Sequence, residues 1–429
     1  MNRSTPGSGP ISGSVSRGLS RRSVVSLGGS VLSVGVVHSV LGSEPGLTQP
    51  PRTLKPDKAP AAPTATRDAG KPVSLTAAAQ EGGPVIPGPP ARKVRFALVG
   101  LGKLMIDEIL PALKLTPRCE ITALVTGNPE KGKAFADMLG LGRDRVFGYE
   151  DIARFDRDET IDAVYIATPN SVHARDTVAA LRAGKHVLCE KPIAATLEQA
   201  DAMVAAAAET GRKLMIAYRV HHEPLNLAIK EMLKERIYGK PNFVIFDALL
   251  DVGKKPQPRL SKELSGGGSL FDIGIYALNT TCWLLGESPT QVNAMQVEHA
   301  GDARFDEVEG SIAFQLRFAS GCVATCTSSY GSASVNRYRI VCEKGWMGMN
   351  PATHYRGIKG EHGDASGQTT LGKPETVNQF AAEFEHFAEC IQEDRPVDSP
   401  GEEGRRDLAL MLKIYEAART GRTISTSDL

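Results

Sequence analysis

RFALVGLGK, residues 95–103, is a short apolar run that ends in two glycines separated by one residue. From about Lys103 to Leu115, apolar residues recur every three or four positions, which predicts a helix. In such a strand–turn–helix unit the first glycine permits the tight turn, and the second lets the backbone approach a pyrophosphate at the helix N-terminus. The segment therefore predicts the start of a Rossmann dinucleotide-binding fold, with Gly100 and Gly102 in these two roles.

The sequence after this unit continues to alternate between short apolar runs and helical periodicity. Expected strands cover 121–125, 161–167, 186–189 and 213–217, and expected helices cover 129–139, 173–183 and 197–210. Such alternation is typical of βαβ units that build a parallel sheet. We therefore predict an α/β protein whose Rossmann domain covers residues 93–217.

The second half has a different pattern, with several strands in succession and fewer helices between them. Expected strands cover 243–249, 292–297, 311–318, 322–328 and 338–341, and expected helices cover 278–285, 378–392 and 404–419. This pattern predicts an α+β domain over 218–429 with a large, mostly antiparallel open sheet. We expect this domain to bind the substrate, and its exposed sheet face to form a homo-oligomer interface.

The end of the second expected strand indicates which dinucleotide is bound. Thr126-Gly127-Asn128 stands where NAD-binding proteins usually have an Asp or Glu for the ribose hydroxyls. Lys131 and Lys133 follow, within reach of a 2′-phosphate. The pattern favours NADP over NAD, although the two lysines are also consistent with ordinary solvated helix residues.

Further motifs give the chain a family resemblance. They are Thr168-Pro169-Asn170 with His173, AGKHV at 183–187, Glu190-Lys191-Pro192 and GGGSLFDIGIY at 266–276. Together with the glycine turn they resemble the Gfo/Idh/MocA oxidoreductase family over about residues 95–425. The expected dinucleotide contacts are Gly100, Gly102, Lys103, Leu104, Thr126, Gly127, Asn128, Lys131, Tyr149, Thr168, Pro169, Asn170, His173, Glu190, Lys191 and Arg219.

Three residues of these motifs suit the oxidation of a sugar hydroxyl, which needs a base for the O–H proton. Free tyrosine has a pKa of about 10, too high for a base at neutral pH, but a lysine ammonium nearby favours the phenolate. We therefore predict Tyr276 as acid/base, Lys191 as the charge that tunes it, and Asp272 as the residue that orients them. Asp272 and Tyr276 share one face if their segment is helical. The expected substrate-binding residues are Lys191, Tyr218, Arg259, Asp272, Tyr276 and Tyr355.

Within the family the likeness is greatest to members that transfer a hydride between two sugars. It implies a tightly bound, non-dissociating NADP, an aldose oxidised to its lactone, and a second sugar reduced to an alditol in a ping-pong cycle. Two alternatives remain open at this point. One is an NAD-dependent glycoside hydrolase of the same family, and the other is an NADP-binding regulator without catalytic activity.

The first 90 residues differ in composition from the rest of the 429-residue chain. They hold nine basic and four acidic residues, no aromatic residue, and 11 prolines between Pro45 and Pro90. Such a stretch is unsuited to a packed core. Ser20-Arg21-Arg22-Ser23 before the apolar run 24–41 resembles a twin-arginine export signal. We expect a signal over 1–43, a Pro-rich arm over 44–92 that is either a spacer or a docking arm, use of the twin-arginine export machinery, and a periplasmic location.

Charge and cysteine usage exclude several other classes of protein. Lys and Arg total 50 against 49 Asp and Glu, which argues against nucleic acid as a partner. The seven cysteines form no C-x-x-C motif, so neither a disulfide framework nor a zinc motif is predicted. The pair His221-His222 lacks a metal-binding spacing, and we interpret His222 as a structural histidine. We therefore predict no metal site.

Overall fold

The computed structural model describes residues 92–372 and 377–429. The predicted export signal and all of the Pro-rich arm except Arg92 lie outside these ranges. Within them, no helix combines the length and the apolar character needed to cross a membrane. All seven cysteines lie in the described ranges, and each is a buried free thiol.

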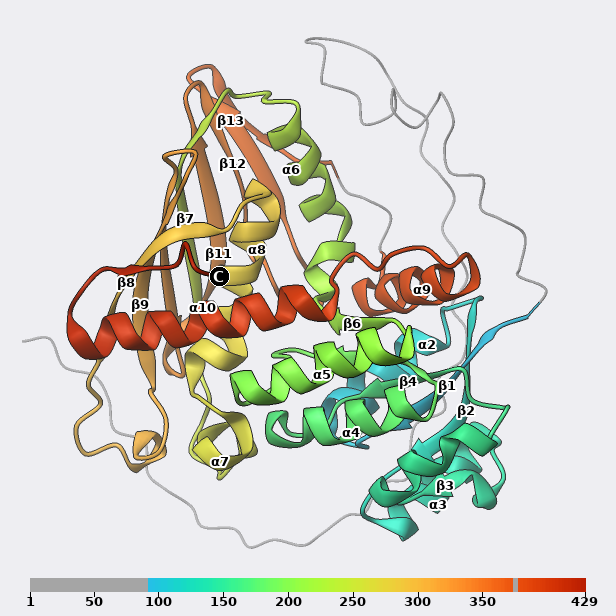
Figure 1. The fold of residues 1–429 in the computed structure, drawn as a ribbon. Helices are drawn as coiled ribbons and strands as arrows, with labels where there is room; N and C mark the ends of the chain where they lie inside the picture. The colour runs from blue at the N-terminus through green and yellow to red at the C-terminus, as the bar shows by residue number, and fades with distance from the viewer. Residues whose placement is uncertain (1–91, 373–376) are drawn as a thin grey trace, which may run out of the picture. The chain divides into compact units, whose positions relative to one another are not determined.

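The first sheet has the strand order of a Rossmann domain. Its strands are β1 (Val94–Val99), β2 (Cys119–Val125), β3 (Val146–Phe147), β4 (Ala163–Ile166), β5 (His186–Glu190) and β6 (Leu214–Ala217). They pair in the order β3-β2-β1-β4-β5-β6, and every pair is parallel. Figure 1 shows α4 (Asn170–Arg182) and α5 (Leu197–Thr210) on one face of this sheet. The predicted parallel sheet is confirmed, and the carboxyl ends of its strands form one edge, where such folds bind ligands.

The second sheet has nine strands. They are β7 (Pro241–Asp251), β8 (Pro289–Val297), β9 (Ser311–Phe318), β10 (Val323–Ser329), β11 (Gly331–Cys342), β12 (Gly345–Met349), β13 (Gly360–Asp364), β14 (Gly367–Thr370) and β15 (Ile424–Ser425). Their order is β14-β13-β12-β11-β7-β10-β9-β8-β15, and only the β7–β10 pair is parallel. The predicted mostly antiparallel sheet is therefore confirmed. The sequence did not predict β12–β15, because the first three are short and rich in glycine and β15 has only two residues.

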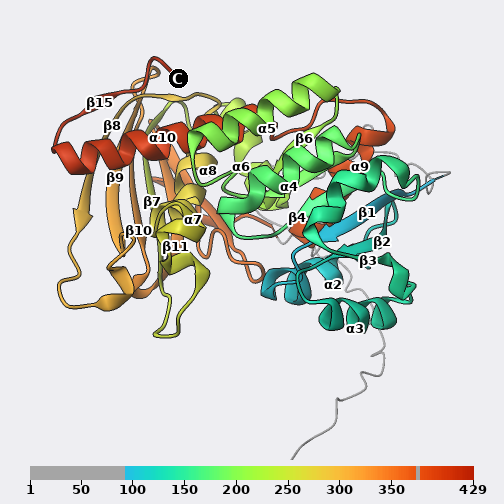
Figure 2. The same ribbon diagram turned by 60° about the horizontal axis from the view of Figure 1, so that its bottom comes forward.

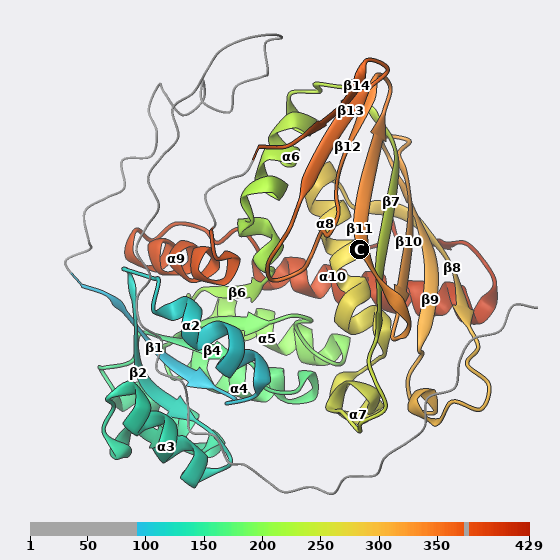
Figure 3. The same cartoon turned by 180° about the vertical axis from the view of Figure 1, so that it is seen from behind.

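Helices cover one face of the second sheet and leave the other face open (Figure 3). The covering helices include α8 (Ile275–Leu285) and α10 (Gly401–Thr420), and α10 also packs against α5 and β6 of the first domain. Along β7, Val244 and Phe246 are buried under the helices. The alternate side chains of Phe243 and Ile245 are 55% and 46% exposed on the other face. One face of the sheet thus carries the core, and the other has exposed apolar side chains.

Helix α9 (Gln379–Gln392) belongs to the second half of the sequence but packs on the Rossmann sheet, as Figure 2 shows. Its Phe384 ring lies 5.2 Å from the ring of Phe96 in β1 and 5.0 Å from that of Tyr165 in β4. Residue 218 does mark the end of the first sheet, but the C-terminal half helps to cover that sheet. As a result, α9 lies beside the short 3₁₀ helix η4 (Arg219–His222) that follows β6.

Candidate active site

The glycine turn has the geometry that a dinucleotide needs. Gly100 has φ +89°, and a Cβ added to it would lie 2.7 Å from the carbonyl oxygen of Ala167. A Cβ added to Gly102 would meet no described atom within 4 Å, so backbone here faces open space. A π-helical turn, Met105–Ile109, begins just after Lys103 and Leu104 and continues as α2 (Leu110–Leu113). The turn therefore fits a pyrophosphate that contacts its backbone.

The predicted residues at the end of β2 form a small network beside this turn. The Asn128 side chain caps α3 (Pro129–Leu139) by accepting a hydrogen bond from the Lys131 backbone N–H at 3.0 Å. The Lys131 ammonium donates to the carbonyl oxygen of Leu101 at 2.5 Å. Thr126 is buried, and its hydroxyl accepts from the Asn128 N–H at 3.2 Å. A cation is thus held between the end of β2 and the glycine turn.

Tyr149 and Gly127 lie next to each other in the same region. A Cβ at Gly127 would approach the Tyr149 ring to 3.2 Å, which explains the small residue there. The guanidinium of Arg175, on α4, lies 5.3 Å from the centre of the same ring. Sequence reasoning missed Arg175, because a lone arginine on an amphipathic helix carries no signal of its own. These residues do not line the cleft that borders the glycine turn.

His173 links the turns that follow β4 and β5. Its buried ring lies between two carbonyl oxygens, with Nδ1 3.0 Å from that of Pro192 and Nε2 2.8 Å from that of Thr168. Burial lowers the pKa of this imidazole. The side chain of Asn170 donates to the Ser265 carbonyl oxygen at 2.8 Å, which links the same edge to the second domain. These residues therefore position the loops around the cleft.

The predicted catalytic residues Lys191, Asp272 and Tyr276 come together, although Lys191 is more than 80 positions from the other two in the sequence. The Lys191 ammonium is 3.1 Å from the Asp272 carboxylate and 2.5 Å from the Asp272 carbonyl oxygen. It lies 4.7 Å from the centre of the Tyr276 ring. Asp272 lies in the π-helical turn Leu270–Gly274, which continues into α8 with Tyr276. The predicted shared helical face thus places both side chains beside one lysine.

Asp272 has three charged or polar partners. Arg259 donates to one of its carboxylate oxygens at 2.6 Å, and the Tyr330 hydroxyl donates to the same oxygen at 2.8 Å. Burial alone would raise the pKa of the Asp272 carboxyl, but the charges of Lys191 and Arg259 hold it well below its usual range. Burial would lower the pKa of Lys191, but Tyr276, Asp272 and Glu190 hold it above its ordinary value. The site therefore keeps an ionised carboxylate beside an ionised ammonium.

Arg219 supplies a second cation beside the Tyr276 hydroxyl. Its guanidinium donates to that hydroxyl at 3.0 Å, to the Thr353 carbonyl oxygen at 2.7 Å and to the Gln379 side chain at 2.6 Å. It also stacks on Tyr355, 4.6 Å from the ring centre. Lys191 thus lies over the Tyr276 ring, and Arg219 is hydrogen-bonded to its hydroxyl. Tyr330, Thr353 and Gln379 were not found from the sequence, because they lie far along the chain in segments without a motif.

Two other predicted residues are more enclosed. Glu190 is buried, its carboxylate accepts a hydrogen bond from the Tyr165 hydroxyl at 2.7 Å, and burial raises its pKa. Tyr218 is also buried, and its hydroxyl donates to Asp407 at 2.9 Å, away from the cleft. The structure thus gives Tyr218 a packing role and does not bring it to the predicted substrate site.

Two adjoining clefts meet at the predicted catalytic residues. One, of about 390 Å³, is lined by the glycine turn, Thr168–Asn170 and His173. The other, of about 410 Å³, is lined by residues of β7 and β11 and by His354 and Arg356. Both are lined by Lys191, Arg219, Arg259, Asp272, Tyr276 and Tyr355. A dinucleotide in the first cleft and a small substrate in the second would face each other across the Lys191–Tyr276 pair.

This fold and this site define a dinucleotide-dependent oxidoreductase. Residues 94–218 match the model of the oxidoreductase family with an NAD-binding Rossmann fold, and residues 226–348 match the GFO/IDH/MocA C-terminal domain. The chain belongs to the Gfo/Idh/MocA oxidoreductase family, as the motifs predicted.

Several relatives are sugar oxidoreductases. The solved structure of aldose-aldose oxidoreductase from Caulobacter crescentus is 40% identical, with a TM-score of 0.76 over 78% of this chain and 100% of that one. The D-xylose 1-dehydrogenase [NADP(+)] of Haloarcula marismortui is 34% identical over 77% of this chain and 92% of its own length. The 1,5-anhydro-D-fructose reductase of Ensifer adhaerens is 28% identical over 76% and 97%. The family therefore includes NADP-dependent sugar oxidoreductases, which is consistent with a dinucleotide cleft beside Lys191 and Tyr276.

Proposed function

We propose that this protein is a sugar–sugar oxidoreductase of the glucose–fructose oxidoreductase type. It would oxidise an aldose to its lactone and reduce a second sugar to an alditol. The observation that carries the proposal is that Tyr276 lies close to both Lys191 and Arg219, where the two clefts meet. The relatives that act on aldoses support the choice of substrate class.

The chain's own residues handle the protons of both half-reactions. Tyr276, as phenolate, takes the proton of the aldose C1 hydroxyl, and later returns it to the carbonyl oxygen of the second sugar. Lys191 and Arg219 stabilise the phenolate, and Asp272 holds Lys191 in place. A bound nicotinamide dinucleotide supplies the hydride acceptor for the first sugar and, once reduced, the hydride donor for the second. Each cycle therefore balances without any other oxidant.

We propose NADP as the dinucleotide. The support is the lysine at 131, held beside the glycine turn, together with a hydroxyl and an amide at the end of β2 where NAD-binding proteins place a carboxylate. Glu130 is the acidic residue closest in sequence to Thr126; its side chain is 84% exposed and forms an ion pair with Lys133. A 2′-phosphate would thus meet a cation rather than a repelling carboxylate.

We further propose that the protein is exported with NADP already bound. The arginine pair Arg21-Arg22 before an apolar run supports a twin-arginine route, which carries folded proteins. A periplasm has no nicotinamide pool, so the cofactor must stay bound and be reoxidised in place. Replacing both arginines by lysine should leave the protein in the cytoplasm; unchanged periplasmic activity would contradict this proposal.

The open face of the second sheet supports a homo-oligomer. Phe243, Ile245 and Met295 are exposed on it, the last to 74%. Exposed apolar patches of this kind mark interaction surfaces. Ile245→Lys should therefore lower the oligomeric state in analytical ultracentrifugation, and an unchanged sedimentation coefficient would contradict the assignment.

A stopped-flow experiment tests the proposed activity. Purified protein without added dinucleotide is mixed first with glucose and then with fructose, and near-ultraviolet absorbance is followed. Glucose should reduce the bound dinucleotide, and fructose should reoxidise it. The proposal fails if glucose causes no reduction, or if NADP dialyses away within minutes.

A further inference from the structure

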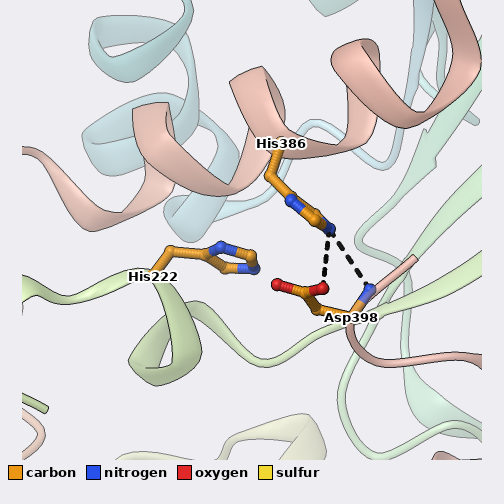
Figure 4. A group of neighbouring side chains, drawn as sticks. All are labelled: His222, His386 and Asp398. Atoms are coloured by element: carbon orange, nitrogen blue, oxygen red, sulfur yellow. Dashed lines mark hydrogen bonds and ion pairs between the residues drawn. The ribbon is translucent and has the colours of Figure 1, made fainter. Parts of the chain in front are cut away.

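A second group of polar side chains lies outside the lining of both clefts. It consists of His222 at the end of η4, His386 in α9, and Asp398 in the connection between α9 and α10. One side-chain ligand atom from each lies within 4.8 Å of the other two. Figure 4 shows the two imidazoles and the carboxylate pointing toward a common point.

His222 has an unexplained buried nitrogen. The residue is only 8% exposed, and its Nε2 has no hydrogen-bond partner among the described residues. In Figure 4 this nitrogen is on the side of the ring that faces the Asp398 carboxylate. The His222 and His386 rings are 4.9 Å apart and tilted by 37°. Buried polar atoms are seldom left without a partner, so this nitrogen indicates a ligand that bonds to it.

The donor set is that of a zinc-type ion. Two imidazole nitrogens and one carboxylate oxygen suit Zn²⁺ and its neighbours, whereas Ca²⁺ and Mg²⁺ require mostly oxygen ligands. A ring as buried as that of His222 is held neutral by the cost of burying a charge, and neutral imidazole is the form that ligates metals. Of the charges that act on His386, Asp398 and Glu389 are negative and Arg395 is positive, and the Asp398 carboxylate also interacts with Lys230.

Metal binding would draw the three ligand atoms, which lie within 4.8 Å of one another, closer together. His386 Nε2 is 3.6 Å from an Asp398 carboxylate oxygen. Ligands about 2.0 Å from a tetrahedral Zn²⁺ lie roughly 3.3 Å from each other. The Asp398 backbone N–H donates to the same Nε2 at 3.2 Å, and the Cys390 thiol lies 3.4 Å from it, so metal binding would displace both contacts. Cys390 lies nearby, but its thiol already donates to the Pro396 carbonyl oxygen at 3.2 Å. Three protein ligands therefore leave one position for water.

We propose that His222, His386 and Asp398 bind one divalent zinc-type ion, with water as the fourth ligand. The ion would join η4 to α9 and to the end of the connection that leads to α10. Arg219 belongs to η4 and Gln379 to α9, and their side chains are hydrogen-bonded to each other at 2.6 Å beside Tyr276. The site would thus stabilise the wall of the active site without contact with the substrate.

Zinc titration of the full-length, untagged holoprotein by calorimetry, after treatment with a chelator, tests the site. One Zn²⁺ should bind per chain. Asp398→Ala and His386→Ala should each raise the dissociation constant for Zn²⁺ by at least about 100-fold, since even residues that only support metal ligands contribute about 10–100-fold to metal affinity. Asp398 is 59% exposed, so its removal disturbs no core. Asp394→Ala is the matched control, because that carboxylate is in the same connection, is 97% exposed and pairs with Lys213 instead.

The proposal predicts that the control keeps the affinity of the unmodified protein. It also predicts that Zn²⁺ raises the thermal midpoint of the unmodified protein and of Asp394→Ala, but not that of Asp398→Ala. No zinc binding, or an affinity in Asp398→Ala and His386→Ala equal to that of the unmodified protein, would overturn the site. An unchanged thermal midpoint on saturation would overturn its stabilising role.

Discussion

Replacing Tyr276 by phenylalanine removes one phenol oxygen and leaves the ring, so it separates chemistry from packing. The Tyr276 hydroxyl accepts one hydrogen bond, from Arg219 at 3.0 Å. Arg219 keeps its bonds to Thr353 and Gln379 in the variant. One guanidinium N–H loses its partner, so the stability loss should be about 1–3 kcal/mol.

The effect on catalysis should be much larger. Loss of a positioned acid/base group costs about 10²–10⁴-fold in rate, which corresponds to about 3–5 kcal/mol of barrier. The assay is single-turnover reduction of the bound dinucleotide by glucose, with dinucleotide content measured on the same preparation. We expect that content to be unchanged, because the Tyr276 hydroxyl is not part of the glycine turn.

Tyr238→Phe is the matched control. It also removes a phenol oxygen, but the Tyr238 hydroxyl is hydrogen-bonded to the His362 ring at 2.7 Å, outside both clefts. This variant should reduce its dinucleotide at the unmodified rate. If folded, dinucleotide-loaded Tyr276→Phe also reacted within tenfold of that rate, Tyr276 would not be the acid/base.

The remaining predictions concern the glycine turn and pH. Gly100→Ala should lower the free energy of unfolding by at least about 1–3 kcal/mol, because its positive φ and the nearby Ala167 oxygen exclude a Cβ. Gly102→Ala should keep the thermal midpoint of the dinucleotide-free protein but weaken dinucleotide binding, and equal effects of the two substitutions in thermal denaturation and in NADP titration would contradict their separate roles. Burial and, secondarily, repulsion from Asp407 raise the pKa of Glu403 to about 7. Since the unfolded value is about 4.3, the folded state binds the extra proton, and the stability from this group falls as pH rises from about 4 to 7. Glu403→Gln should therefore stabilise the protein at pH 8 by up to about 3 kcal/mol and have little effect on its stability at pH 4. Chemical denaturation at both pH values measures the difference. An equal change in the free energy of unfolding at pH 4 and pH 8 would contradict the prediction.

The parts of the site that could be predicted are those with a local pattern. Gly100 and Gly102 follow an apolar run and precede a helix, so their role can be derived from a few neighbouring residues. Lys191 directly follows a buried strand, and Asp272 and Tyr276 are four positions apart in a helical segment. Such features specify both secondary structure and the direction of the side chain.

Residues without such a pattern required the fold. Gln379 reaches Arg219 only because α9 returns to the Rossmann sheet, a long-range packing event driven by Phe384 and Phe387. Tyr218 directly follows a strand, as expected, but its hydroxyl turns to Asp407 in α10, almost 190 positions away. His222, His386 and Asp398 come from three segments for the same reason. Spacing in the sequence carries no information on such encounters.

Deuterium transfer between the two sugars tests the central claim most directly. Protein without added dinucleotide is incubated with glucose deuterated at C1 and with unlabelled fructose, and the alditol is analysed by mass spectrometry. A sugar–sugar oxidoreductase that retains its NADP should yield alditol with one deuterium per molecule, and an excess of free unlabelled NADPH should not dilute the label. Absence of alditol, or alditol without deuterium, would contradict the account.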